Sequence, residues 1–477
     1  MATSEPTDYT IPDSLRFYAK QRVELVVATS RQISEAVLKY YPKAEYTVEE
    51  VLTGMAEDII TEADKEEPDV AESDSQIVSL VNRVLIDGYN KGASDIHFEP
   101  GYREKPFQVR YRVDGICQVV HQIPKSYKRA IISRIKIISN LDISEHRKPQ
   151  SGKILVWHES SKIEYRVEIT PTVGGNEDAV LRILSTGEPM SLEKMDFSRT
   201  NLKNMKDILS QPYGIVLCVG PTGSGKTTTL HSALKHLNTP DVKIWTVEDP
   251  VEITQDGLRQ VQVQPKIGLT FAEVLRSFLR ADPDVIMIGE MRDQETARIA
   301  IDASLTGHLV LSTLHTNSAP ETIVRLIEMG IDSFNFADAF LGTLAQRLAR
   351  RLCEKCKESY HPDKFEYDRL VQLYGADLFM QHGGKAYTDD LMIMKKTGCS
   401  FCNDSGYKGR IGIHELLVST PTIKELIQHS APMDQLRSRA IAEGMRTLLM
   451  DGIMKIFQGF TDLAEILRVC RIEKNVG

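Results

Sequence analysis

The feature that most constrains this chain is the glycine-rich segment GPTGSGKT at residues 220–227. The apolar run IVLCV at 215–219 precedes it and predicts a buried parallel strand, and residues 228–237 predict a helix that begins at the lysine. In this context backbone N–H groups close around phosphates, and the helix N-terminus stabilises their negative charge. We therefore predict a P-loop that binds a nucleotide, rather than a chance glycine-rich turn.

The residue types within this segment suggest their roles. Lys226 is expected to reach the β- and γ-phosphates, and the Thr227 hydroxyl is expected to ligate Mg²⁺. The predicted nucleotide-binding segment comprises Gly220, Pro221, Thr222, Gly223, Ser224, Gly225, Lys226, Thr227 and Thr228.

The composition narrows the class of protein. A length of 477 residues suggests about three domains, and 42% hydrophobic residues indicate folded cores. The net charge of −8 disfavours a nucleic-acid protein that relies on a broad basic surface. No apolar run is long enough to span a membrane, and the polar N-terminus lacks the apolar core of a secretory signal. The sequence thus predicts a soluble, cytoplasmic protein.

Upstream of the P-loop the chain divides into three parts. Residues 1–56 look like the remnant of a small N-terminal domain, and residues 57–74 form an acidic linker in which Lys65 is the single basic residue. Residues 75–185 combine helices expected at 77–89 and 128–139 with strands, which predicts an α+β domain. The strands are expected at 107–113, 116–123, 154–157, 163–169 and 179–184, the first two forming a hairpin.

Downstream, strands alternate with helices around the P-loop, which predicts a doubly wound α/β domain. Three further strands are expected at 244–247, 285–288 and 309–314. The polar residues that follow these strands are Glu248, Asp249, Glu252, Glu290 and His315. Because open α/β sheets bind ligands at the carboxyl ends of their strands, we expect these side chains to face the nucleotide.

Glu290 is the predicted general base. A carboxylate just beyond a buried strand can orient water on the γ-phosphate, although an acid on a surface loop is the alternative. Gly289 stands where a Walker B aspartate is usual. Glu248, Asp249 and Glu252 are therefore candidates to complete the Mg²⁺ shell or to share the base role, with helix capping as the alternative.

Two histidines bracket the last of these strands. His315, at its carboxyl end, is the expected γ-phosphate sensor. His308, which precedes the strand, is predicted to contact the nucleotide, with a core histidine as the alternative.

Four cysteines form two C-x-x-C pairs, Cys353 with Cys356 and Cys399 with Cys402. Four thiolates can close a tetrahedral structural Zn²⁺ site that has no open position for catalysis. Thiolate chemistry and accidental free cysteines are the alternatives.

The motifs GPTGSGKTT, VEDPVE, LRSFLRADPDVIMIGEMRD, TGHLVLSTLHTN and AQRL follow in this order, with GASDIHFEP upstream. Over residues 75–470 they resemble the motif series of the secretion ATPases, the hexameric motors of type II secretion and type IV pilus assembly. The resemblance implies a PAS-like domain at 75–185, a RecA-like ATPase domain at 186–350, a tetracysteine zinc subdomain at 351–406 and a helical C-terminal subdomain at 407–477. In this family the tetracysteine insertion is typical of secretion and pilus-extension motors, not of retraction motors.

The resemblance also gives roles to four arginines. Arg276 and Arg280 are implied to contact the nucleotide or a neighbouring subunit, although their helical spacing alone is more typical of a solvated face. Arg166 and Arg182 match a stretch whose arginines close onto the phosphates, with outward solvated side chains as the alternative.

Two features depart from the family pattern. Residues 147–153 replace the aspartate and last arginine of its Arg-x-Pro-Gln-Asp-Gly-Arg segment, and the N-terminal domain is nearly missing, as in a truncated or shortened chain.

These observations predict a homohexameric ATPase at the cytoplasmic face of the inner membrane that uses ATP, Mg²⁺ and a structural Zn²⁺. The implied partners are an inner-membrane platform protein and its cytoplasmic docking partner, through which the ATPase associates with the membrane. No nucleic-acid partner is expected. Pilus extension and type II secretion both stay open. The alternatives are a RecA-like nucleic-acid translocase with a zinc ribbon, which the acidic balance disfavours, and a non-hydrolysing scaffold.

Overall fold

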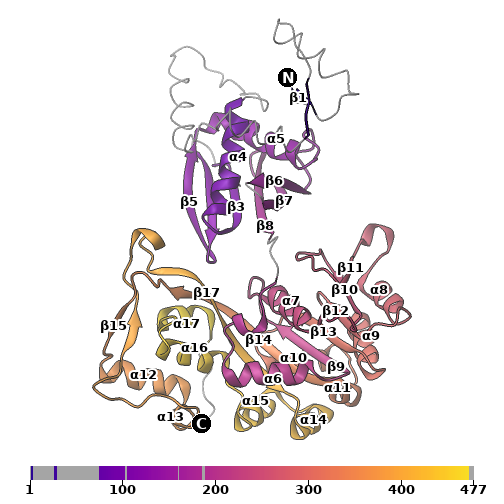
Figure 1. Cartoon of the computed structure of the whole chain (residues 1–477), viewed down its shortest axis with the longest axis vertical. Helices are drawn as coiled ribbons and strands as arrows, with labels where there is room; N and C mark the ends of the chain where they lie inside the picture. Colours follow the sequence, from indigo (N-terminus) through magenta and orange to yellow (C-terminus); the bar gives the residue numbers. More distant parts are fainter. Residues whose placement is uncertain are drawn as a thin grey trace, which may run out of the picture.

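The computed structural model describes residues 2–3, 26–29, 75–101, 105–158, 161–184 and 189–471. The predicted linker at 57–74 and most of the predicted N-terminal remnant lie outside these residues; within the remnant, β1 (Ala2–Thr3) pairs in parallel with β2 (Val26–Val27). The described chain forms two main bodies, one built on a six-stranded sheet and one on a seven-stranded sheet (Figure 1).

The first body is the PAS-like domain. Its elements are α4 (Ser75–Asn90), β3 (Ala93–Glu99), β4 (Phe107–Val113), β5 (Ile116–Ile123), α5 (Lys128–Ile138), β6 (Gln150–His158), β7 (Ser161–Thr172) and β8 (Asn176–Leu184). The antiparallel sheet runs β5-β4-β3-β8-β7-β6 and shares one hydrophobic core with both helices. Along β4 every second side chain enters that core, namely Phe107, Val109 and Tyr111. The predicted α+β class and its hairpin are confirmed.

The second body corresponds to the predicted RecA-like domain. Its strands are β9 (Gly214–Val219), β10 (Ile244–Glu248), β11 (Arg259–Gln262), β12 (Val285–Ile288), β13 (Leu309–Leu314), β14 (Phe340–Leu352) and β17 (Tyr407–Val418). They run in the order β11-β10-β12-β13-β9-β14-β17, and every neighbouring pair is parallel except the last. The parallel sheet predicted around the P-loop strand is confirmed.

Helices cover both faces of this sheet (Figure 1). The helices are α6 (Arg199–Leu209) and α7 (Lys226–Leu237) on one face, and α8 (Phe271–Phe278), α9 (Gln294–Leu305), α10 (Ala319–Glu328) and α11 (Ser333–Ala339) on the other. Alternate residues of β9 therefore enter different cores: Ile215 and Leu217 pack with α8 to α11, and Val216 and Cys218 pack with α6 and α7. A strand buried on both faces has a continuous apolar sequence, which explains the IVLCV run.

Residues 407–418 differ from the prediction. The family resemblance assigns them to the helical C-terminal subdomain, whereas they form β17, antiparallel to β14. Without β17 the edge of β14 would be open, and residues 411–417 are buried without a break, as expected of a strand covered on both faces. The helical part begins later, with α14 (Pro421–Gln428), α15 (Met433–Ala442), α16 (Leu448–Phe457) and α17 (Leu463–Val469).

The segment between β14 and β17 forms a small insertion. Its elements are β15 (Glu358–Tyr360), α12 (Lys364–Tyr374), α13 (Ala376–Gln381) and β16 (Ile393–Lys395), and β15 pairs with β16. The two cysteine pairs lie where the insertion leaves β14 and returns to β17. In the described part of the chain, the helices are all too short or too polar to cross a membrane.

Candidate nucleotide-binding and catalytic site

The P-loop joins β9 to α7 at the carboxyl edge of the sheet. Lys226 is buried, and its Nζ donates to the carbonyl oxygens of Gly220 at 2.7 Å and Pro221 at 3.1 Å, so the ammonium lies within the loop. Gly225, which caps the helix, has a φ of +89°, a conformation that glycine adopts readily. Among the described residues the buried Ser224 hydroxyl has no hydrogen-bond partner. A central cation and a free buried donor fit a phosphate group.

Gln346 on β14 braces the P-loop. Its side-chain amide donates to Ser224 O at 2.8 Å, and its side-chain carbonyl accepts from Thr229 Oγ1 at 2.6 Å. A Cβ at Gly220 would lie 2.6 Å from the Gln346 main-chain oxygen, so β14 and the loop are in direct contact. Gln346 was not among the predicted site residues. The sequence shows Gln346 as a polar residue within the AQRL motif. A polar side chain that becomes buried needs hydrogen-bond partners.

Glu290 lies two residues beyond β12 and contacts His315 at the end of β13. Its Oε2 accepts from Arg292 Nε at 2.9 Å, and its Oε1 lies 2.9 Å from His315 Nε2. Burial lowers the pKa of Lys226, and the negative charge of Glu290 opposes that shift. The predicted base, the predicted γ-phosphate sensor and the P-loop lysine therefore occupy one site.

Glu248, at the end of β10, is a buried carboxylate held by three groups. Its Oε1 accepts from Thr246 Oγ1 at 2.6 Å and from Gln260 Nε2 at 3.1 Å, and its Oε2 lies 3.3 Å from His231 Nε2. Gln255 Nε2 donates to His231 Nδ1 at 2.6 Å, which assigns the proton of a neutral His231 to Nε2 and directs it at Glu248. His231 was not among the predicted site residues, because it is one of several polar residues of α7 and its sequence context does not indicate a partner.

Two further acids line the same cleft. Asp249 Oδ2 lies 3.7 Å from Arg292 Nη1, and Glu252 opposes the fall in the Lys226 pKa that burial causes. Carboxylate and hydroxyl oxygens are the ligands that Mg²⁺ prefers, and the Thr227 hydroxyl lies in the same cleft. The donor set of this cleft therefore fits a magnesium ion.

The PAS-like domain presents a row of charged side chains to this cleft. Arg112, Asp95, Arg182 and Arg166 are successive cross-strand partners on β4, β3, β8 and β7. Arg182 Nε donates to Asp95 Oδ1 at 3.0 Å, and Arg112 Nε lies 3.6 Å from Asp95 Oδ2. All four line a cleft of about 820 Å³ together with P-loop residues, Glu290 and His315. The two arginines predicted to close onto the phosphates thus lie in one cleft with the P-loop.

Arg276 and Arg280 do not line this cleft. Arg276 pairs with Glu273 at 3.4 Å and with Glu295 on the next helix, and Arg280 is exposed beyond the end of α8. Both side chains are exposed to solvent in this chain, Arg276 on the outer face of α8 and Arg280 in the turn that follows it.

His308 also lies away from the cleft. It precedes β13, at the opposite end of the strand from His315, and its Nδ1 is 2.8 Å from Ala303 O on α9. The prediction of a nucleotide contact for His308 is therefore wrong for the site within this chain, because the whole length of β13 separates it from the carboxyl edge.

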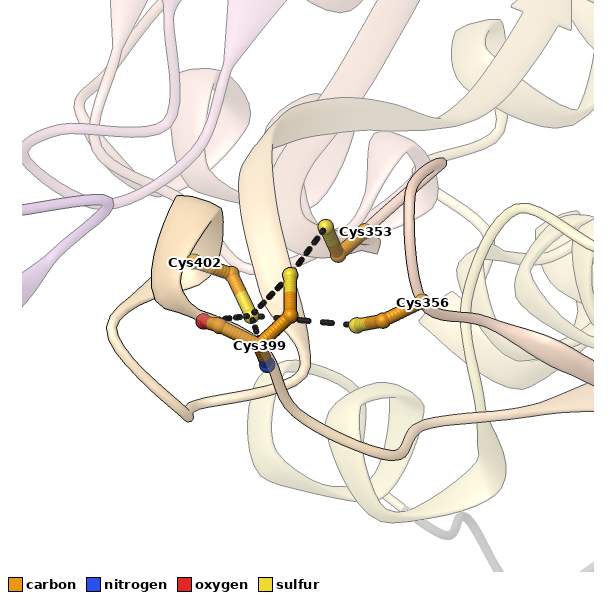
Figure 2. Close-up of side chains that lie close together, drawn as sticks. All are labelled: Cys353, Cys356, Cys399 and Cys402. Carbon is orange, nitrogen blue, oxygen red and sulfur yellow. Dashed lines mark hydrogen bonds between the residues drawn. The ribbon is translucent and has the colours of Figure 1, made fainter.

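The four cysteines converge on one point (Figure 2). Their sulfurs lie 3.9 Å apart for Cys353 and Cys399, 3.8 Å for Cys356 and Cys402 and 3.8 Å for Cys399 and Cys402. A tetrahedral Zn²⁺ with bonds of about 2.3 Å requires sulfurs about 3.8 Å apart. Burial opposes ionisation of the Cys402 thiol, but N–H donors from Cys399 and Gly406 outweigh it and lower its pKa. The cluster therefore fits a structural zinc ion.

A P-loop with a carboxylate and a histidine at strand ends, in one cleft with an arginine-bearing second domain, defines an ATPase with a RecA-like core. The family described as Type II/IV secretion system protein matches residues 70–468, and the chain belongs to this family. The family described as MshEN domain matches residues 1–47.

Individual relatives agree with this assignment. The chain is 42% identical over 473 residues to the type IV pilus assembly ATPase PilB of Myxococcus xanthus, covering 98% of this chain and 81% of the relative. It is 42% identical over 402 residues to the type II secretion system ATPase E of Vibrio cholerae, covering 84% and 76%. The solved structure of the Legionella pneumophila ATPase DotB has a TM-score of 0.61 at 21% identity, covering 85% of this chain and 97% of that chain. The pilus retraction motor PilT has a TM-score of 0.55 at 23% identity, covering 81% and 96%. At these identities the two structures show a shared fold.

Proposed function

We propose that this ATPase works as a homohexamer in which ATP hydrolysis moves the PAS-like domain against the RecA-like domain. The observation that carries the proposal is the shared cleft, which combines the P-loop with Arg166 and Arg182 of the other domain. The movement would drive assembly of a pilus or pseudopilus, a role that the names of the pilus assembly and type II secretion relatives support. The proposed location is the cytoplasmic face of the inner membrane, reached through a platform protein and its cytoplasmic docking partner.

Nucleotide binding falls to the P-loop side of the cleft. Lys226 and the backbone N–H groups of residues 222–227 bind the β- and γ-phosphates. Thr227, Asp249 and Glu252 would hold Mg²⁺, which neutralises phosphate charge when bound.

Glu290 is the proposed general base. It orients the attacking water and accepts its proton, while Arg292 and His315 fix the direction of the carboxylate. Glu248 is the weaker candidate, because three groups already contact its oxygens. It serves better as a buried anchor at the end of β10.

The arginines of the PAS-like domain act as a clamp in this proposal. Phosphoryl transfer spreads charge over the γ-phosphate oxygens, and a guanidinium offers planar paired donors to them. ATP then binds more tightly when the domains are closed than when they are open, and this difference shifts the population toward the closed state. Hydrolysis removes the difference and releases the domain.

The tetracysteine cluster is proposed to bind one Zn²⁺ per chain in a structural role. The sulfur separations support this, and four thiolates leave no open position on the metal.

The test is Lys226→Ala, introduced into the chromosomal gene and also purified. We expect loss of ATP turnover in the purified protein, and loss of surface pili or of exported enzymes in the cells. Which output fails distinguishes pilus assembly from type II secretion. Retention of both outputs would contradict the motor, and stimulation of turnover by single-stranded DNA would favour the nucleic-acid translocase.

A further inference from the structure

The tip of the β4–β5 hairpin contacts the ATPase domain at β17. Asp114 Oδ2 accepts a hydrogen bond from Gly409 N at 2.8 Å, and its Oδ1 lies 3.9 Å from Arg410 Nε. The Asp114 side chain is 20% exposed, so the contact is partly shielded from water. Nothing in the proposed nucleotide chemistry uses Asp114.

Both partners hold conformations suited to this contact. Asp114 and Gly115 have φ values of +49° and +84°, as in a two-residue type I′ hairpin turn, whose twist matches that of the strands. Gly409 has a φ of +79°, which glycine adopts without strain. The contact therefore joins a tight turn to a defined backbone N–H.

β17 begins just after the tetracysteine cluster. Gly406 N donates to Cys402 Sγ at 3.3 Å, and Gly406 O accepts from Cys353 N at 2.9 Å, so one cysteine of each pair holds this residue. The next residue, Tyr407, is buried, and Gly409 follows two positions later. The cluster and the hairpin contact are therefore linked through a few residues of anchored backbone.

The other end of the link reaches the arginines. Arg112 stands two residues before Asp114 and lies 3.6 Å from Asp95, which in turn accepts from Arg182. Arg410, the second partner of Asp114, lines the nucleotide cleft. The hairpin tip therefore lies close in sequence to one arginine of the row and contacts a residue that lines the nucleotide cleft.

We propose that Asp114 is an interdomain latch through which the tetracysteine cluster positions the PAS-like domain over the nucleotide cleft. The inference rests on the proposed arginine clamp, whose donors lie on the latched sheet. Asp114 touches no reacting group, so it is a positioning residue. Loss of the latch should slow turnover without weakening nucleotide binding at the P-loop.

Three substitutions test the latch. Asp114→Gly removes the side chain but suits the positive φ of the turn, and Asp114→Asn keeps both the turn and an acceptor for Gly409 N. Asn140→Gly, at an exposed position of the same domain with a φ of +56°, is the matched control. From the usual strength of one charge-assisted hydrogen bond, we expect Asp114→Gly to lower turnover by roughly 10- to 100-fold with ADP affinity unchanged. Asp114→Asn should restore most of the rate, and the control should match wild type.

Hydrogen–deuterium exchange at the Gly409 amide gives a readout independent of catalysis. Exchange should accelerate in Asp114→Gly, and also in wild-type protein stripped of zinc by a chelator. A Gly409 amide that stays protected in either sample would overturn the latch, and faster exchange with normal turnover would overturn its positioning role. Arg182→Ala separates the two proposals: normal turnover in that variant refutes the clamp, whereas the exchange result still decides whether Asp114 holds the domains together.

Discussion

Arg182 Nε donates a hydrogen bond to Asp95 Oδ1 at 3.0 Å, between partners on neighbouring strands of the PAS-like sheet. This bond uses one of the five N–H groups of the guanidinium and leaves its paired terminal donors for phosphate oxygens. Asp95 is itself buried and also lies 3.6 Å from Arg112. A buried acid therefore aligns Arg112 and Arg182, and it leaves the terminal donors of Arg182 for a phosphate.

Arg182→Ala should leave nucleotide binding at the P-loop largely intact while lowering turnover by ~10³-fold, if the side chain acts as a full arginine finger. Arg182→Lys should restore little activity, because an ammonium lacks the planar pair of donors. Steady-state ATPase rates together with measured ADP affinity check both expectations. Arg110→Ala is the matched control, since Arg110 pairs with Glu99 on the same sheet and does not line the cleft. Wild-type rates in both Arg182→Ala and Arg166→Ala would make the PAS-like domain a passive spacer.

Glu290→Gln should bind ATP and fold normally but lose turnover by ~10²-fold or more, the range typical of a general base. The glutamine is nearly isosteric, but it cannot accept the proton of the attacking water. Rapid-quench measurement of the chemical step, with nucleotide affinity measured in parallel, checks this. Near-normal hydrolysis in the purified variant would move the assignment to Glu248, and Glu248→Gln is the comparison.

Much of the site could be predicted because its signals are local. The P-loop requires a strand, glycines and a helix within one short segment, and the rule of carboxyl strand ends placed Glu290 and His315 on one edge. Their 2.9 Å contact depends on the register of β12 against β13, which pairs Ile288 with Ser312. The residue pattern of either β-strand alone does not specify how the two strands align.

The site residues that were not predicted depend on partners that lie far away in the sequence. Gln346 and His231 lie among other polar residues of β14 and α7, so the sequence shows neither that these two side chains become buried nor which partners they contact. The contact from Gln346 to Thr229 joins β14 to α7, and this pairing exists only once the sheet has formed. His308 is a different error: strand direction alone places it at the amino end of β13, away from the nucleotide edge.

Protein purified without chelator should contain one Zn²⁺ per chain. Cys399→Ser removes one thiolate, so we expect loss of zinc and faster proteolysis within 353–406, with ADP affinity retained. Elemental analysis and limited trypsin digestion measure the two effects. Cys117→Ser, which lies outside the cluster, controls for the loss of a thiol. Zinc-free protein from such a preparation would reject the metal site.

Gln346→Leu should weaken ATP binding by roughly 10-fold, because it removes the two hydrogen bonds from Gln346 to Ser224 O and Thr229 Oγ1 and loosens the P-loop. Thr229→Val removes only one of the two bonds and should have a smaller effect. If the brace is real, the double variant should bind ATP about as weakly as Gln346→Leu alone, since both changes act on one network. Calorimetric titration with a non-hydrolysable ATP analogue measures these affinities, and fully additive losses would argue against a shared brace.

Glu465 should make part of the stability of the C-terminal helices depend on pH. Burial alone would raise its pKa, but donors from Arg350 and Arg468 outweigh burial and lower the pKa to about 2 from an ordinary value of 4.5. A carboxylate whose pKa is lower in the folded state contributes fully above about pH 4.5, and the contribution is lost as the pH falls toward 2. Glu465→Gln should therefore lower the free energy of unfolding by about 3 kcal/mol at pH 7, and the difference from wild type should shrink steadily below pH 4.5.

Urea unfolding followed at several pH values measures this difference, and Glu425→Gln, an exposed acid on α14, controls for the loss of a surface carboxylate. A gap between Glu465→Gln and wild type that is equally large at pH 7 and pH 3 would show that Glu465 stabilises the fold by packing and not by its charge.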